Sequence, residues 1–190
     1  MSNMSYSSNQ VIPPHGGYKK LMLYQMAEIV YDLTVKFCKS YMSYSSNKTY
    51  TRTYDQMIQA ARSGKQNIAE GSMASGISKK TELKLIGVAR ASLEELLVDY
   101  QDFLRTKDLK LWGKDDPQAQ AVRRLAYRSN KSYKTYTTYL KSAESASNCL
   151  ICLIHQTNYL LDKQLAALEN EFLEKGGFTE ALYRARRARV

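Results

Sequence analysis

Apolar residues recur at intervals of three and four along residues 85–104, the spacing that places side chains on one face of an α-helix. This stripe comprises Leu85, Ile86, Ala89, Leu93, Leu96, Leu97, Tyr100, Phe103 and Leu104. A stripe this long and regular predicts a core helix. Only 9 glycines and 3 prolines occur in the 190 residues, too few for the many turns of a β-sandwich. We therefore expect an all-α protein.

Three other long segments have a helical period. They cover residues 19–41, 51–75 and about 132–173, although residues 133–139 could form a separate turn or a bend. Ser78 is placed to cap the stripe helix, and the run from Trp112 to Pro117 is expected to stop it. An extra helix is predicted over about 118–128. The pattern predicts an up-and-down four-helix bundle with an inserted basic helix and a basic C-terminal tail.

The length of the chain suits one domain with tails. Residues 1–17 are rich in Ser, Asn, Pro and Gly, which predicts a disordered leader. Residues 18–175 form the predicted bundle, with an insertion at about 112–141. Gly176 and Gly177 are expected to end the last long helix, and residues 176–190 form the basic C-terminal tail.

The cysteines and the hydropathy pattern indicate a compartment. Cys38, Cys149 and Cys152 make an odd count, and the last two lie within a helical pattern, which argues against a disulfide framework. No signal peptide and no run of roughly 18 apolar residues is visible. We therefore expect a cytoplasmic protein with no membrane partner.

The spacing Cys149-x-x-Cys152-x-x-His155 resembles a metal-binding pattern, but three residues at this spacing spread over a wide arc of one helix. We expect core packing there and neither a metal nor another cofactor. Neither histidine lies in a nucleophile motif, and no Glu-x-x-His pair of the di-iron type occurs. The chain is therefore predicted not to be an enzyme and to have no catalytic residues.

Positive charge is concentrated in two segments. The formal net charge is +10. Residues 105–141 hold ten basic and three acidic residues, a net charge of +7, and residues 175–190 hold five and one, a net charge of +4. The rest of the chain is nearly neutral, which points to acidic partners for these two segments.

The first segment combines cations with aromatic residues, a combination that binds phosphates while the rings stack on bases. The predicted nucleic-acid-binding residues there are Arg123, Arg124, Arg128, Lys131, Lys134, Lys141, Tyr133 and Tyr136, and those of the tail are Arg184, Arg186, Arg187 and Arg189. The alternatives are a solvated helix face with its tyrosines packed on the bundle, and a frayed basic tail.

Residues 56–71 form a helix rich in small side chains, which allow a neighbouring backbone to approach closely. Ser63, Asn67 and Glu70 follow one another at intervals of four and three, so they share one face. We expect a buried polar ladder there, whose groups must find hydrogen-bond partners on other helices.

This segment resembles the Q-I-R-R-A-A-x-S-I-P-x-N-I-A-E-G signature of the four-helix-bundle proteins encoded in intervening sequences of bacterial 23S rRNA genes. Accessory variability proteins of diversity-generating retroelements are similar. The matching residues are Gln56, Ala60, Ala61, Ser63, Asn67, Ile68, Ala69, Glu70 and Gly71. Residues 89–96, which include Ser92 and Glu95, are similar to the A-R-G-S-L-x-E-L motif of the third helix in that family.

The chain departs from the family pattern at several positions. Ile58 and Gln59 stand where the family often has two arginines, and Gly64 and Lys65 replace its usual Ile-Pro. Any role of those arginines therefore does not transfer to this chain. The inserted basic segment and the C-terminal suffix resemble a longer subgroup.

The resemblance implies a ring of about five protomers with a cationic surface that acts through nucleic acid and a protein partner. Together with the charge pattern, it predicts a non-enzymatic homo-oligomer, expected to be pentameric, that binds RNA or DNA through basic patches. The alternative is a scaffold or adaptor for a protein such as a reverse transcriptase, without direct nucleic-acid binding.

Overall fold

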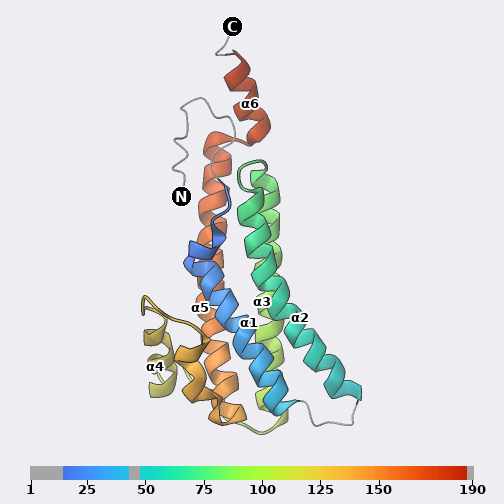
Figure 1. Ribbon diagram of the computed structural model, residues 1–190, viewed down its shortest axis with the longest axis vertical. Helices are drawn as coiled ribbons and strands as arrows, with labels where there is room; N and C mark the ends of the chain where they lie inside the picture. The colour runs from blue at the N-terminus through green and yellow to red at the C-terminus, as the bar shows by residue number, and fades with distance from the viewer. Residues whose placement is uncertain (1–14, 43–47, 188–190) are drawn as a thin grey trace, which may run out of the picture.

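The computed structural model describes residues 15–42 and 48–187, without the side chains of 48–51. Every regular element among the described residues is helical, so the all-α prediction is confirmed (Figure 1). The elements are η1 (Tyr18–Lys20), α1 (Met22–Tyr41), α2 (Lys48–Ala74), α3 (Lys79–Thr106), α4 (Pro117–Leu125), η2 (Tyr133–Lys141), α5 (Ala143–Lys175) and α6 (Phe178–Arg187).

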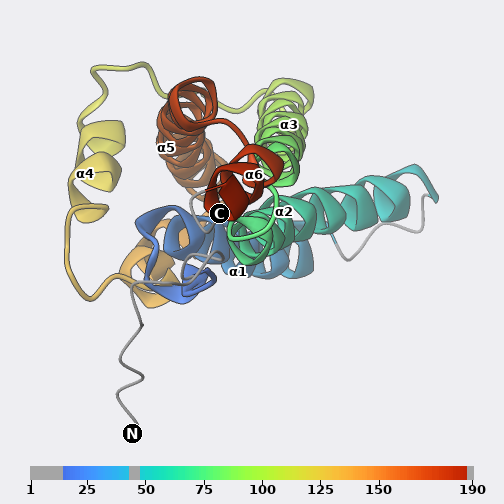
Figure 2. The same ribbon diagram turned by 90° about the horizontal axis from the view of Figure 1, so that it is seen from above.

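The four long helices form the bundle. α2 packs on α3, α3 on α5, α5 on α1 and α1 on α2, and Figure 2 shows α4 outside this group, beside α5. Of the stripe predicted on α3, Leu85 is half-buried and the other residues are buried in the core. Burial of such apolar faces supplies the main driving force for folding.

The helix ends follow local chemistry. Ser78 caps α3 as predicted, because its Oγ accepts a hydrogen bond from the backbone N–H of Thr81 at 3.2 Å. The predicted end of α3 at Trp112 is wrong, since the helix ends at Thr106. Asp108 follows in a left-handed conformation, with φ of 52°, which an α-helix cannot continue.

The last predicted helix is divided in two. Residues 133–141 form the separate 3₁₀-helix η2, and Ser142 then caps α5 by accepting from the backbone N–H of Ser145 at 3.2 Å. Gly176, with φ of 70°, ends α5 as predicted. The extra helix is α4, which is slightly shorter than predicted and begins with Pro117.

The predicted disordered leader, residues 1–17, can be compared with the structure only at residues 15–17, because residues 1–14 lie outside the described residues. Residues 15–17 do have a defined place against the end of α2, contrary to the expectation of disorder. The backbone N–H of Gly16 donates to the carbonyl of Ser72 at 3.0 Å, and Ser72 Oγ donates back to the Gly16 carbonyl at 3.3 Å. In the described part of the chain, no helix is long and apolar enough to cross a membrane.

A candidate nucleic-acid interface at α4 and η2

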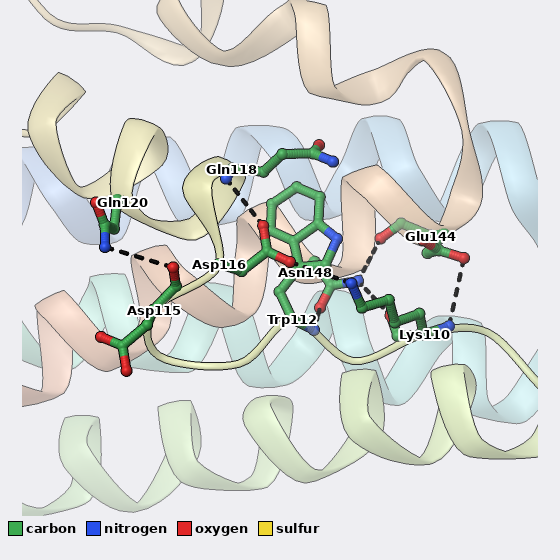
Figure 3. Close-up of polar contacts among 8 residues, drawn as sticks. All are labelled: Lys110, Trp112, Asp115, Asp116, Gln118, Gln120, Glu144 and Asn148. Carbon is green, nitrogen blue, oxygen red and sulfur yellow. Dashed lines mark hydrogen bonds and ion pairs between the residues drawn. The ribbon is translucent and has the colours of Figure 1, made fainter.

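Two side chains of α5, Asn148 and Glu144, hold the connection that leads from α3 to α4 (Figure 3). Asn148 Oδ1 accepts from the backbone N–H of Trp112 at 2.7 Å, and Asn148 Nδ2 donates to the carbonyls of Lys110 at 2.7 Å and Glu144 at 2.9 Å. Asp116 then caps α4 by accepting from the backbone N–H of Gln118 at 2.9 Å. These contacts fix where the inserted helix begins.

α4 is amphipathic, and its small apolar face packs on the bundle. Ala119 and Val122, with Ala126 directly after the helix, are buried. Arg124 and Arg128 point away from that face and are exposed, whereas Arg123 is half-buried. Its guanidinium donates to the carbonyl of Lys114.

The lysines of η2 and of the residues just before it are also at least partly accessible. Lys134 and Lys141 are exposed and Lys131 is half-buried. In the described residues, the ion pairs involve other cations, so Arg124, Arg128, Lys134 and Lys141 have no acidic partner. We call these four residues the α4–η2 basic surface. Exposed cations without acidic partners produce the positive potential that attracts polyanions.

The tyrosines of η2 correct the stacking prediction. A 3₁₀-helix has three residues per turn, so Tyr133, Tyr136 and Tyr139 lie on one face, and that face packs on the bundle. Tyr136 is 0% exposed, and burial raises the pKa of its phenol to about 12. The prediction that Tyr136 stacks on bases is therefore wrong. The packing of tyrosines on the bundle, which the alternative expected, is confirmed for Tyr133, Tyr136 and Tyr139.

The charges of two arginines influence the pKa values of two tyrosines of η2. Burial is the largest influence on the pKa of both Tyr136 and Tyr139 and raises it, but Arg128 and Arg124, respectively, act to lower it. Opposite influences of this kind require the arginine charges to lie near the rings. Arg124 and Arg128 therefore lie close enough to η2 for their charges to act on these phenols.

Lys36 and Tyr127 lie beside the four residues of the α4–η2 basic surface and were not among the predicted binding residues. Lys36 of α1 is exposed and lies 4.8 Å from the ring centroid of Tyr133, so α1 adds a cation from about 100 positions earlier in the chain. No local sequence signal could have indicated this contact. Tyr127 is 82% exposed and is the aromatic side chain beside α4 that remains accessible.

The predicted cations of the tail lie at the other end of the bundle (Figure 1). Arg184, Arg186 and Arg187 of α6 are exposed, while Arg189 lies outside the described residues. Arg184 donates to the carbonyl of Lys175, and the guanidinium carbon of Arg187 is 5.8 Å from the ring centroid of Tyr183. One protomer therefore does not join the two cationic segments into a continuous patch.

The polar ladder is present but shorter than predicted. The hydroxyl oxygens of Ser63 and Ser92 are 3.0 Å apart across α2 and α3, and Asn67 Nδ2 donates to the Ser63 carbonyl at 2.9 Å and its Oγ at 3.1 Å. Gly71 is buried, but Gln56, Glu70 and Glu95 are exposed. The prediction that Glu70 belongs to a buried ladder is wrong, because its position on α2 faces outwards.

The cysteines and His155 do not converge. Cys149 is buried, Cys152 is half-buried and His155 is exposed. Burial raises the pKa of the Cys149 thiol well above its usual value and that of Cys38 to about 12, which keeps both thiols protonated and unreactive. Within the described residues, no cluster of three or more His, Cys, Asp or Glu side chains could hold a metal ion.

Neither protein-family models nor curated proteins nor solved structures match this chain.

Proposed function

We propose that this chain is a non-enzymatic, homo-oligomeric helical-bundle protein that binds the phosphate backbone of RNA or DNA through the α4–η2 basic surface. The observation that carries the proposal is that Arg124, Arg128, Lys134 and Lys141 are all exposed and form no ion pair with any acidic residue in the described part of the chain. The buried ring of Tyr136 removes one means of base recognition, which favours binding with little sequence preference.

Self-association has separate support. Val88 and Val98 are exposed on α3, and Ala91 and Glu95 lie between them at intervals of three and four, so a narrow stripe on this helix faces outwards. The family that the two motifs resemble forms rings of about five protomers. Repetition of a weak phosphate-binding surface around a ring would increase its overall affinity without any new contact.

Fluorescence anisotropy with labelled single-stranded RNA, single-stranded DNA and duplex DNA tests nucleic-acid binding. The variant carries Arg124→Gln, Arg128→Gln, Lys134→Gln and Lys141→Gln. A matched control carries Arg52→Gln, Arg62→Gln, Lys80→Gln and Lys84→Gln, which removes the same charge from exposed positions on α2 and α3. Light scattering checks that both variants keep the oligomeric state of the parent.

The α4–η2 variant should bind at least tenfold more weakly at low salt. For duplex DNA, its slope of log affinity against log salt concentration should be shallower by up to about four, since each lost phosphate contact removes about 0.9. The control should keep most of the parent's slope. Equal losses in the two variants, or no salt-dependent binding by the parent, would contradict the proposal. Capture of a protein such as a reverse transcriptase that survives nuclease treatment would instead support the adaptor function.

A further inference from the structure

A pocket of about 620 Å³ lies between α4, α5, the start of α1 and the connection at residues 111–114. Its inner walls are apolar and include Met26, Trp112 and Ile151, all of which are buried. The volume falls within the range of about 300–1,000 Å³ that is common for sites of small ligands. The pocket shares α4 with the α4–η2 basic surface, but none of the four residues of that surface lines it.

Large apolar side chains remain exposed around the mouth of the pocket. Met22, Leu111, Tyr127 and Tyr159 all line the pocket and are exposed. Exposed apolar side chains that gather at one concave place, rather than being scattered, indicate a surface that is covered by a ligand or a partner. The polar groups of the lining decide which of these occupants fits.

Charge in the lining has a single sign. Lys114 and Arg123 line the pocket, and no lining residue is Asp or Glu. The neighbouring carboxylate of Asp116 is already paired with Lys110 at 3.3 Å. Burial raises the pKa of the Cys152 thiol, Arg123 acts to lower it and Asp116 acts more weakly to raise it, so the guanidinium is the stronger of the two charges at the α5 wall of the pocket. The charge complement of this lining is an anion.

One buried hydrogen-bonding atom in the lining has no partner among the residues that the structure describes. Gln156 donates from Nε2 to the carbonyl of Arg123 at 3.1 Å, but its Oε1 is buried and accepts no hydrogen bond. A buried acceptor without a donor is unfavourable, and a ligand that brings a hydroxyl or amide N–H would satisfy it. The lining therefore offers an apolar surface, a cationic side and a free acceptor.

We propose that this pocket binds a small amphipathic carboxylic acid that carries one hydrogen-bond donor, such as an N-acyl amino acid. The acyl chain lies against Met26, Trp112 and Ile151. The carboxylate faces Arg123 and Lys114, and the amide N–H donates to Gln156. A second copy of the chain or a helix of a partner protein fits less well, because neither needs a cationic lining without acids.

Trp112 is the single tryptophan of the chain and forms a wall of the pocket, so its fluorescence reports on binding there. The probe is N-decanoylglycine, and its methyl ester is the neutral control that keeps both the acyl chain and the amide. The parent protein should give a saturable change in Trp112 emission with the acid and bind the ester at least tenfold more weakly. No saturable change, or equal affinity for acid and ester, would overturn the proposal.

Two neighbouring arginines provide matched variants. Arg123→Gln should reduce the preference for the acid over the ester to about twofold or less, while Arg124→Gln removes the same charge from a position outside the pocket and should keep the parent's preference. Circular dichroism verifies that both variants fold. An equal loss of preference in both variants would assign the effect to overall charge and refute the site. Concentration-dependent dimerisation that Leu111→Glu abolishes, without any response to the acid, would show a protein interface instead.

Discussion

Gly64 of α2 lies so close to Leu93 of α3 that a β-carbon at position 64 would fall 2.7 Å from Cδ2 of Leu93. Leu93 is fully buried, so its side chain has no open space into which it could move. The contact joins the two motifs of the chain, because Gly64 belongs to the first and Leu93 to the second. It also gives a physical reason for the glycine at position 64 of this chain.

Gly64→Ala is therefore expected to lower the free energy of unfolding by about 1–3 kcal/mol, the usual cost of adding a methyl group to a filled core. Gly87→Ala is the matched control, since nothing lies within 4 Å of a β-carbon there. Because Ala is the better helix former, that variant should be more stable by up to about 1 kcal/mol. Urea denaturation of both variants measures the difference, and similar effects would refute tight packing at Gly64.

The shortened polar ladder predicts different effects at two positions of the same helix. Asn67→Ala removes the hydrogen bonds to Ser63 and should cost about 1 kcal/mol. Glu70→Ala should change the free energy of unfolding by less than about 0.5 kcal/mol, because Glu70 is exposed. Thermal and urea unfolding report both values. A larger loss in the Glu70 variant would indicate that Glu70 has a partner in the assembled oligomer.

Asp99 predicts a pH dependence of stability. Burial, with smaller contributions from Glu95 and Asp102, raises its pKa to about 6, and its Oδ2 is buried without a hydrogen-bond partner among the described residues. Because this pKa is higher in the folded than in the unfolded chain, the ionised carboxylate destabilises the fold above pH 6. Protonation relieves that penalty as the pH falls from about 6 to about 4.

The comparison with Asp99→Asn isolates this group from the other carboxyls of the chain. At about pH 7.5 the variant should be more stable than the parent, and this advantage should shrink as the pH approaches about 4.5. Urea denaturation at a series of pH values measures it. A difference that stays constant with pH would mean that the Asp99 carboxyl titrates at its ordinary value.

The helices of the bundle could be predicted because their signals are local. The apolar stripe of α3 and the Ser78 cap each lie within a few residues of the structure that they form. The end of α3 could not be placed in the same way. The connection after Thr106 is fixed by Asn148, which is 36 positions after Trp112 in the sequence.

Only part of the candidate surface could be predicted from the sequence, because the type of helix decides which side chains face outwards. The interleaved tyrosines and lysines of residues 133–141 point in different directions depending on whether the helix is α or 3₁₀. Only the 3₁₀ period brings Tyr133, Tyr136 and Tyr139 into one ridge against the core and leaves Lys134 outside. Composition alone does not distinguish these two arrangements.

Asn148 gives the last prediction, because its side chain makes two of the three hydrogen bonds that join residues 110–112 to α5. Asn148→Ala would leave the backbone N–H of Trp112 and the carbonyl of Lys110 without their partners. Since Trp112 is buried, the expected cost is about 1–3 kcal/mol. Glu144→Gln is the control, because it only weakens the exposed contact to the backbone of Lys110 at 3.3 Å and should cost less than about 0.5 kcal/mol.

The effect of Asn148→Ala should be local as well as global. Release of the connection exposes Trp112, so its emission should shift to longer wavelength while the helical circular dichroism signal stays close to that of the parent. Amide hydrogen exchange should increase across residues 109–116, where the hydrogen bonds to Asn148 are lost, and much less within α3. An unchanged Trp112 spectrum in the folded variant would contradict this function of Asn148, because it would mean that packing alone holds the connection on α5.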